Sequence, residues 1–421
     1  MDEVTRRKMG EQAVALARSC DYHTTGTVEF LMDKNKDFYF LEMNTRLQVE
    51  HPITEEITGI DLVEQQILIA AGHKLEYKQS DVKIKGHSVE YRVYAEDPSR
   101  NFLPSIGHLT KYKEPTAHEN IRIDTGVREG SEISMYYDPM ISKLITWGKD
   151  RKEAMDLIDN AFDEYVVQGV AHNIGFGKSI VHNEAFAAGD YTTAFIPDFY
   201  PEGFRGDSLR QDQKKDIAIA AHNLKNIALS NNFGGEGSVE ESVVYCTVVG
   251  MKEGEADQDW KVEKFEDGRY RVTDLESGKA EDITLSSFEH EHNSLIKMDG
   301  SDGQKTLQVL SNKNDLNFDF YYGGGKVETI VYDEAQFKYK HHMAPPVKID
   351  SAKMIQSPMP GAVVSVNVAA GDKVVDGQEL CILEAMKMQN VIKAEKNGVI
   401  KSVKVKAGDS VTVDELLIEF E

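Results

Sequence analysis

The sequence has few cysteines, and Cys20, Cys246 and Cys381 lie far apart. No two of them form a closely spaced pair, which excludes a disulfide framework and a cysteine-ligated zinc site and fits a reducing compartment. Long apolar runs are absent as well: the sequence has no stretch of about 18 apolar residues, the length needed to cross a bilayer. The sequence therefore predicts a soluble protein that does not have a membrane as its partner.

Positive charge is also scarce. The chain has 48 Lys and Arg residues against 71 Asp and Glu residues, a formal net charge of −23. Nucleic acid would be repelled by this charge, so we exclude it as a partner. The first residues show neither a signal-peptide core nor the acid-poor pattern of a transit peptide. What the chain does have is length, because 421 residues predict roughly two to four domains.

Residues 1 to about 203 mix helix and strand patterns. One apolar face over 6–19 predicts a helix, and helical patterns recur at 62–71 and 153–167. Residues 28–31 and 38–50 read as two strands joined by a polar turn at 33–37. This region is therefore expected to be a mixed α and β domain.

From about residue 208 to 340 the pattern changes. Apolar residues at Ile217, Ala221, Leu224 and Ala228 predict one long helix, and many short β-rich runs follow it. Closely spaced strands of this kind predict an antiparallel barrel or sandwich. The glycine run within 322–326 lacks the spacing of a phosphate loop and predicts a hairpin turn.

The last segment, about 353–421, contains an internal repeat. Residues 361–374 align with 398–411, and the identities include both glycines of each copy, a serine and an aspartate. Copies this short cannot each bury a face alone, so we expect them to pack together as a flattened β-sandwich with a pseudo-two-fold axis. The stretch between them must cross from one half to the other as a hairpin.

Lys387 lies in that connecting stretch, flanked by Met386 and Met388. The strand pattern breaks over 385–388, which predicts a tight turn. A lone lysine in a turn is most often a solvated charge, but methionines are poor residues for a bare, solvated tip. The setting at the centre of the repeat therefore marks Lys387 as a candidate functional residue.

A second polar constellation follows the turn at 33–37. If the strand runs to residue 50, side chains that alternate along it share one face, namely Glu42, Asn44, Arg46, Gln48 and Glu50. The turn would also bring Glu29 beside Glu42. Two carboxylates this close repel by about 4 kcal/mol at 4 Å and intermediate dielectric, and magnesium suits the place because it takes one or two carboxylates plus substrate phosphates. The alternative is a solvent-facing charged strand at a sheet edge.

The residues around Lys387 carry a family resemblance. The run 384–388, Glu-Ala-Met-Lys-Met, resembles the biotin attachment motif of biotin carboxyl carrier domains. This resemblance implies that a biotin protein ligase joins biotin covalently to Lys387 and that the hairpin tip presents it. Lipoyl domains carry a lysine at the same place but without the Met-Lys-Met setting.

The polar constellation resembles a second part of the same family. The run 42–51, Glu-Met-Asn-Thr-Arg-Leu-Gln-Val-Glu-His, is similar over its whole length to biotin carboxylases of the ATP-grasp fold. The resemblance continues through 88–98, 136–140 and Lys143, and does not fade until about residue 205.

This resemblance implies roles for the polar residues. Glu29, Glu42 and Asn44 would hold Mg²⁺ (or Mn²⁺) and the phosphates of ATP, while bicarbonate would be held by Arg46, Gln48 and the backbone of Val49. Glu50 would be the base that deprotonates bicarbonate to form carboxyphosphate. Arg92 would stabilise the enolate form of biotin.

The expected architecture is α+β and multidomain. We predict a C-terminal part of an ATP-grasp biotin carboxylase domain at 1–205 and an antiparallel β-barrel with one long helix at 206–342, which would dock a partner subunit. A linker at 343–352 and a biotin carboxyl carrier domain at 353–421 follow. The family's N-terminal α/β domain and glycine-rich lid have no counterpart here, so the resemblance implies a fragment that is inactive alone.

The resemblance also implies a function. The chain is similar to the biotin-carrying α subunits of acyl-CoA carboxylases, which are ATP-dependent ligases and work with a carboxyltransferase β subunit in hetero-oligomers. The run 195–206 favours propionyl-CoA as the acyl-CoA, and 3-methylcrotonyl-CoA is the alternative. A non-catalytic biotin carrier or scaffold is the competing class. The expected location is the mitochondrial matrix in a eukaryote and the cytoplasm in a bacterium.

Overall fold

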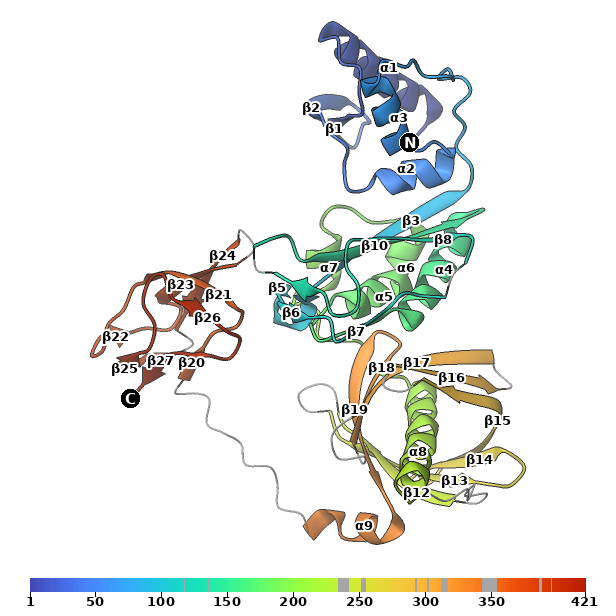
Figure 1. Cartoon of the computed structure of the whole chain (residues 1–421). Coiled ribbons are helices and arrows are strands. Elements are labelled where there is room, and N and C mark those ends of the chain that lie inside the picture. Colours follow the sequence, from blue (N-terminus) through green and yellow to red (C-terminus); the bar gives the residue numbers. More distant parts are fainter. Residues whose placement is uncertain are drawn as a thin grey trace. The chain divides into compact units, whose positions relative to one another are not determined.

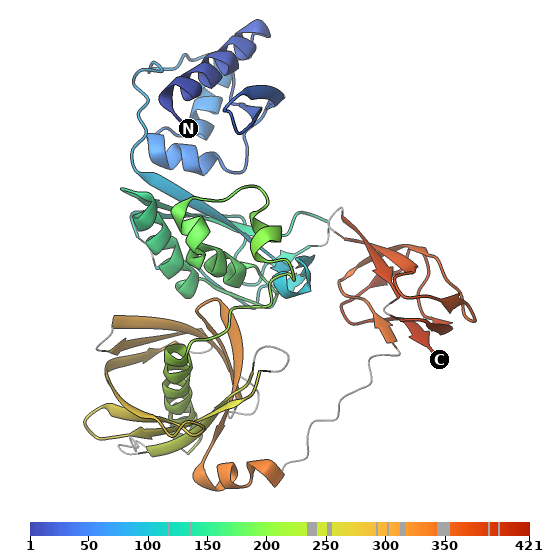
Figure 2. The ribbon, with the colours of Figure 1, turned by 180° about the vertical axis from the view of Figure 1, so that it is seen from behind.

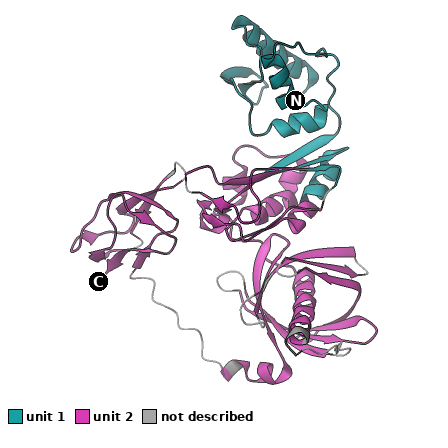
Figure 3. Cartoon of the chain, in the orientation of Figure 1, with its two compact units in different colours: residues 1–91, 118–122, 144–158 teal, residues 92–117, 123–143, 159–421 magenta. Residues whose placement is uncertain are grey.

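The computed structural model describes residues 1–116, 118–134, 136–233, 242–250, 255–291, 294–300, 303–311, 317–342, 354–385, 388–394 and 396–421. It forms two compact units, drawn in teal and magenta in Figure 3. Unit 1 comprises residues 1–91, 118–122 and 144–158, and unit 2 comprises residues 92–117, 123–143 and 159–421.

Unit 1 begins with three helices and one hairpin: α1 (Glu3–Ser19), β1 (Thr27–Met32), β2 (Phe38–Asn44), α2 (His51–Thr58) and α3 (Leu62–Ala70). Side-chain caps define where two of the helices start. Asp2 accepts a hydrogen bond from the Thr5 amide at the start of α1, and Asp61 accepts one from the Glu64 amide at the start of α3. The helices predicted at 6–19 and 62–71 are therefore confirmed.

The second strand is shorter than the sequence predicted. It ends at Asn44, residues 45–50 are irregular, and helix α2 begins at His51. Pro52 in the first turn of α2 explains the helix, because its fixed φ is pre-organised for that position. The prediction that residues 42–50 share one strand face is therefore wrong beyond Asn44. Leu41 lies at an irregularity in the strand register, and its side chain is 50% exposed.

The next region is built from short strands and four helices. Its elements are β3 (His87–Tyr94), β4 (Glu96–Asp97), η1 (Pro98–Arg100), β5 (Leu103–Pro104), β6 (Gly107–His108), β7 (Lys111–Lys113), β8 (Ile121–Thr125), β9 (Glu132–Ile133), β10 (Met140–Gly148), α4 (Arg151–Glu164), β11 (Val166–Gln168), α5 (Ile174–His182), α6 (Glu184–Ala188) and α7 (Phe195–Phe199). The helix predicted at 153–167 ends earlier, at Glu164. Val166 and Val167 continue as a strand that pairs with β7, because branched side chains favour a buried strand there.

A closed antiparallel barrel encloses the next helix, as Figures 1 and 2 show. The helix is α8 (Gln211–Phe233), and the strands are β12 (Ser242–Val248), β13 (Gln258–Lys264), β14 (Arg269–Asp274), β15 (Ala280–His290), β16 (Leu295–Gly300), β17 (Gly303–Ser311), β18 (Asn317–Tyr322) and β19 (Gly325–Tyr332). The predicted helix face is buried at Ile217, Ala221 and Leu224 against strand residues such as Phe320. The predicted barrel with one long helix is confirmed.

The glycine run forms the predicted turn between β18 and β19. Tyr322 pairs with Gly325, and Gly323 and Gly324 between them have φ values of 57° and 86°. Residues with a Cβ rarely adopt these angles, whereas glycine does so at no steric cost. A short helix α9 (Glu334–Lys338) and a single turn η2 (Lys340–His342) follow.

The C-terminal segment forms two four-stranded sheets, in the orders β20-β27-β25-β22 and β24-β23-β21-β26. Their strands are β20 (Met354–Gln356), β21 (Gly361–Val366), β22 (Lys373–Val374), β23 (Glu379–Ala385), β24 (Met388–Lys393), β25 (Gly398–Val403), β26 (Ser410–Val411) and β27 (Leu416–Phe420). The short strand of each repeat copy pairs with the long strand of the other, β26 with β21 and β22 with β25. This exchange confirms that the two copies build one β-sandwich together.

Candidate functional site

Strands β1 and β2 place the predicted metal-binding residues side by side. Glu29 pairs directly with Glu42 in the antiparallel register. The Asn44 amide Nδ2 donates hydrogen bonds to Glu29 Oε1 at 2.7 Å and to Glu42 Oε1 at 3.1 Å. Gln48 reaches the same Glu29 oxygen from the following loop, with its Nε2 at 3.2 Å. The structure thus brings together four of the predicted site residues.

The cluster contains the two carboxylates that the sequence analysis predicted to hold magnesium. Glu29 and Glu42 both accept a hydrogen bond from the same Asn44 Nδ2 atom, and Glu29 also accepts one from Gln48. Among the residues that the structure describes, no group of three or more His, Cys, Asp or Glu side chains could hold a metal ion. Magnesium does not require such a group, because it binds through one or two carboxylates and keeps its remaining positions for phosphates and water.

The loop from 45 to 50 holds the residues predicted to bind and deprotonate bicarbonate. Arg46 is exposed, and its Nη1 donates a hydrogen bond to the Leu47 carbonyl at 3.3 Å. Val49 is half-buried, and Glu50 is exposed at the position that precedes α2. These residues therefore belong to a loop and a helix start rather than to the strand face that the alternation predicted.

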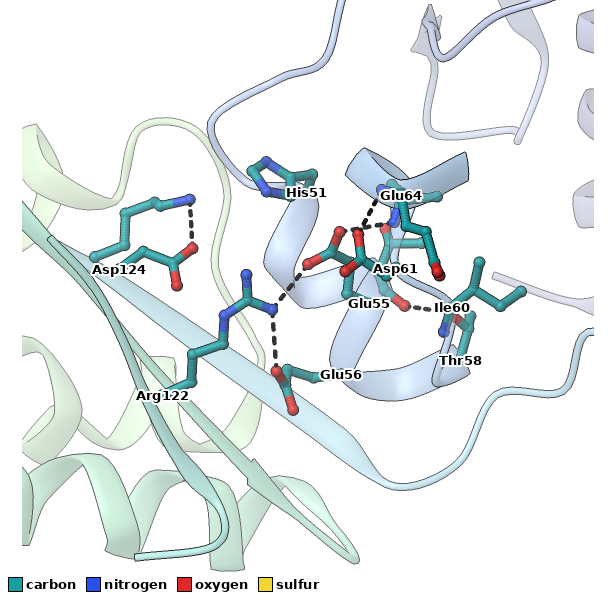
Figure 4. Close-up of polar contacts among 12 residues, drawn as sticks. His51, Glu55, Glu56, Thr58, Ile60, Asp61, Glu64, Arg122 and Asp124 are labelled. Carbon is teal, nitrogen blue, oxygen red and sulfur yellow. Dashed lines mark hydrogen bonds and ion pairs between the residues drawn. The ribbon is translucent and has the colours of Figure 1, made fainter. Parts of the chain in front are cut away.

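Helix α2, which follows Glu50 directly, is anchored by an ion pair that Figure 4 shows. Arg122 Nη1 lies 2.8 Å from Glu55 Oε2 and 3.3 Å from Glu56 Oε1. The buried Glu55 also accepts a hydrogen bond from the Leu62 amide at 2.8 Å, which links α2 to α3. This ion pair could not be predicted from the sequence, because Arg122 lies far from α2 along the chain. The adjacent acids Glu55 and Glu56 are its one local signal.

Arg92 lies in the part of β3 that belongs to unit 2. Asn173 holds the backbone on both sides of the next residue, Val93. The Asn173 Nδ2 donates to the Arg92 carbonyl at 3.1 Å, and its Oδ1 accepts from the Tyr94 amide at 2.9 Å. The sequence offered no signal for this support except an amide residue just before the helix pattern of α5.

The predicted attachment residue Lys387 lies outside the described residues, as does Met386. The strands on either side of them are described: β23 and β24 pair along their length, and Ala385 pairs with Met388. Beside the last pair, Gln389 Nε2 donates to Glu384 Oε2 at 2.9 Å. The predicted hairpin that crosses between the repeat copies is therefore present up to these two positions.

No helix among the described parts of the chain is both long and apolar enough to span a bilayer. Three protein-family models match the chain. They are "Carbamoyl-phosphate synthase L chain, ATP binding domain" at residues 1–78, "Biotin carboxylase C-terminal domain" at 90–198 and "Biotin-requiring enzyme" at 353–420. The first match covers the carboxylate cluster, the second covers Arg92 and the third covers Lys387.

Curated relatives match over the whole chain. The mitochondrial propionyl-CoA carboxylase alpha chain of Mus musculus is 41% identical over 100% of this chain and 58% of its own length. The propionyl-CoA carboxylase alpha chain of Ruegeria pomeroyi is 40% identical over 100% of this chain and 64% of its own length. The mitochondrial methylcrotonoyl-CoA carboxylase subunit alpha of Dictyostelium discoideum is 34% identical over 96% of this chain and 58% of its own length. The chain thus spans about three fifths of these relatives.

Proposed function

We propose that this chain, which is homologous over its whole length to part of the propionyl-CoA carboxylase alpha chains, carries biotin on Lys387 for an ATP- and bicarbonate-dependent acyl-CoA carboxylase. The observation that carries the proposal is the C-terminal sandwich. Its exchanged strands and the β23–β24 hairpin lead to Lys387 at the centre of the repeat, within the part matched by the biotin-requiring family model.

The site residues named in the sequence analysis have a role in loading that biotin. Glu29, Glu42 and Asn44 hold magnesium, which supplies charge neutralisation for the ATP phosphates when bound. Arg46, Gln48 and the Val49 backbone hold bicarbonate, and Glu50 accepts its proton. Arg92 stabilises negative charge that develops on the biotin oxygen. We also propose that the biotin carboxylase part ends at residue 205, that the barrel domain ends at 342 and that the carrier domain begins at 353.

Propionyl-CoA is the proposed acyl-CoA. The identity to propionyl-CoA carboxylase alpha chains is 40–41%, against 34% for the methylcrotonoyl-CoA relative. Transfer to the acyl-CoA belongs to a carboxyltransferase β subunit bound by the barrel in a hetero-oligomer. In a eukaryote the proposed location is the mitochondrial matrix and in a bacterium the cytoplasm. We propose the complete carboxylation reaction only for a polypeptide that also contains the part of the relatives' sequence that this chain does not match.

Attachment of biotin tests the core of the proposal. The chain is co-expressed with a biotin protein ligase and its intact mass is measured. The expected result is one biotinyl group, lost in Lys387→Arg and retained in the matched control Lys373→Arg, which changes another exposed lysine of the same sandwich. A biotinyl group that survives Lys387→Arg would contradict the assignment of the attachment residue. A chain that stays unmodified would contradict biotin attachment itself and favour a scaffold without biotin.

A further inference from the structure

Residues 333–342, which follow the last barrel strand, lie against the barrel. They comprise Asp333, helix α9, Tyr339 and the turn η2, and we refer to them as the clip (Figure 1). Helix α9 has five residues and buries none of them. A helix this short is not stable in water by itself, so contacts with the barrel must hold the clip in place.

An aromatic contact joins the first half of the clip to the barrel. Asp333 starts α9 with a capping box, in which its Oδ1 accepts from the Gln336 amide at 2.7 Å and Gln336 Oε1 accepts from the Asp333 amide at 2.9 Å. The Phe337 ring then stacks on Tyr245 of β12, with the ring centroids 4.5 Å apart, and meets Tyr332 of β19 edge-on at 6.1 Å. Helix α9 therefore packs on the neighbouring strands β12 and β19.

Lys340 joins the second half of the clip to a polar pair on the barrel. Its Nζ lies 2.5 Å from Asp259 Oδ1 and 3.0 Å from Thr247 Oγ1. The buried Thr247 hydroxyl donates to the same Asp259 oxygen at 2.7 Å. The ammonium also lies over the rings of Phe337 and Tyr332, at 5.5 and 6.0 Å from their centroids. One side chain thus contacts both the barrel and the α9 ring that packs on it.

The other lysine of this short segment, Lys338, lacks these contacts. It is exposed, and its Nζ lies over the ring of Tyr339, its neighbour in the clip, at 5.9 Å. Within the described part of the chain, neither a hydrogen bond nor an ion pair links the Lys338 side chain to the barrel. Two lysines of equal charge therefore lie two residues apart, and only Lys340 is tied to the barrel.

We propose that the clip fixes the point on the barrel from which the biotin carrier is tethered, and that Lys340 is the positioning residue that holds it. With the clip in place, the tether consists of residues 343–353, between η2 and β20. Without it, the tether starts at the end of β19 and consists of residues 333–353. The ten residues of the clip, extended at about 3.5 Å each instead of folded at about 1.5 Å, lengthen the reach by about 20 Å.

The length of the tether affects how often the carrier meets a site that it can reach. The effective concentration of a tethered group falls roughly as the −3/2 power of tether length. An increase from 11 to 21 residues therefore lowers it by about 2.6-fold. This consequence for biotin on Lys387 rests on the function proposed above, whereas the origin of the tether depends only on the contacts of the clip.

Distances between the barrel and the C-terminal sandwich test the proposal in the full chain. Spin labels are attached at Glu276→Cys in the barrel and Lys373→Cys in the sandwich, both at exposed positions, after Cys20→Ser removes the exposed cysteine. Lys340→Glu replaces attraction to Asp259 by repulsion. It should move the upper end of the distance distribution outward by about 20 Å.

Matched variants separate release of the clip from a general change of charge. Lys338→Glu makes the same change of charge in the same segment and should leave the distance distribution unaltered, as should Lys340→Arg, which keeps the positive charge. The Phe337 and His342 amides bond within the clip, to the carbonyls of Asp333 and Tyr339. Their hydrogen exchange should become about tenfold faster or more in Lys340→Glu alone, while urea unfolding shows that the barrel remains folded.

Three outcomes would overturn the proposal. They are no outward shift in Lys340→Glu with the barrel folded, an equal shift in Lys338→Glu, and clip amides that exchange in the unaltered chain as fast as those of an unfolded peptide. Biotinylation of Lys387 is measured by intact mass on the same variants and should be equal in all of them. Failure of biotinylation is therefore distinguishable from failure of the clip.

Discussion

The barrel and residues 1–91 differ in how they bury apolar side chains. In the barrel, α8 and the eight strands around it share one core, in which Ile217, Val262 and Phe320 are completely buried. In residues 1–91 the apolar side chains of α3 and the β1–β2 hairpin remain exposed. The barrel therefore buries most of its apolar surface within itself, whereas residues 1–91 bury little.

The two regions therefore differ in how well they can support a functional site. A closed barrel has no unpaired strand edges and can keep its shape as an independent platform. The carboxylate cluster of Glu29 and Glu42 is built on the region that buries less apolar surface. Three measurements test the difference between the two regions.

The largest expected effect is a core truncation in the barrel. Phe320→Ala should lower the free energy of unfolding of the barrel by about 3–5 kcal/mol, because it removes a fully buried side chain and leaves a cavity. Leu31→Ala, at a 59% exposed position, should change unfolding by less than about 0.5 kcal/mol. Unfolding of the barrel in urea is followed by Trp260 fluorescence in a Trp147→Phe background. Unfolding of residues 1–91 is followed by hydrogen exchange of the β1–β2 amides. Equal effects of the two substitutions would show that the regions do not differ as described.

The next effect is a pH dependence of the stability of the barrel. Burial of His222 inside the barrel lowers its pKa from 6.5 to about 4, opposed by the Ser242 backbone. The unfolded chain therefore binds a proton at His222 between these values and the folded chain does not, so stability is complete above pH 6.5 and falls as the pH is lowered towards 4. The expected loss is roughly 2 kcal/mol at pH 5 relative to pH 8.

Urea unfolding of the barrel followed at several pH values measures this slope, and His222→Asn is the control. The substitution should flatten the dependence between pH 4 and 6.5 while leaving carboxylate effects at lower pH in place. An unchanged slope in His222→Asn would mean that other groups are responsible and that the buried histidine is not protonated on unfolding.

The smallest effect concerns the one buried charge of residues 1–91. Arg122→Gln removes the bonds to Glu55 and Glu56 and leaves the buried Glu55 carboxylate without its cation. We expect a loss of about 1 kcal/mol, because the arginine is partly exposed and solvent screens the pair. Hydrogen exchange of the α2 and Leu62 amides measures it. Glu56→Gln, which removes only the longer bond, should have less effect, and the reverse order would contradict the anchor.

Much of the fold could be predicted because its signals are local. Gly371 and Gly408 take φ values of 90° and 92°, and the following Asp372 and Asp409 side chains accept from the backbone amides of Ala369 and Lys406. These identical turns are the reason that the repeat is visible in the sequence. The apolar face of α8 was likewise readable, because a helix inside a barrel keeps its 3.6-residue period.

The candidate site was predicted less completely. Glu29, Glu42 and Asn44 meet as expected, because the turn at 33–37 determines the register of the hairpin. The polar alternation continued past Asn44 without a strand, so the positions of Arg46 and Glu50 were predicted wrongly. The local signal for the helix is Pro52, a residue type favoured in the first turn of a helix.

The sequence by itself determined the features that depend on neighbours along the chain: the repeat, the turns, the long helix and the types of residue in the polar cluster. Only the tertiary structure decided which strands exchange between the repeat copies, that Arg122 anchors α2, and which apolar side chains stay uncovered. These outcomes depend on contacts between residues far apart in the chain, and a local pattern does not specify which distant residue becomes the partner. For that reason apolar side chains form a closed core in the barrel but stay exposed in much of residues 1–91.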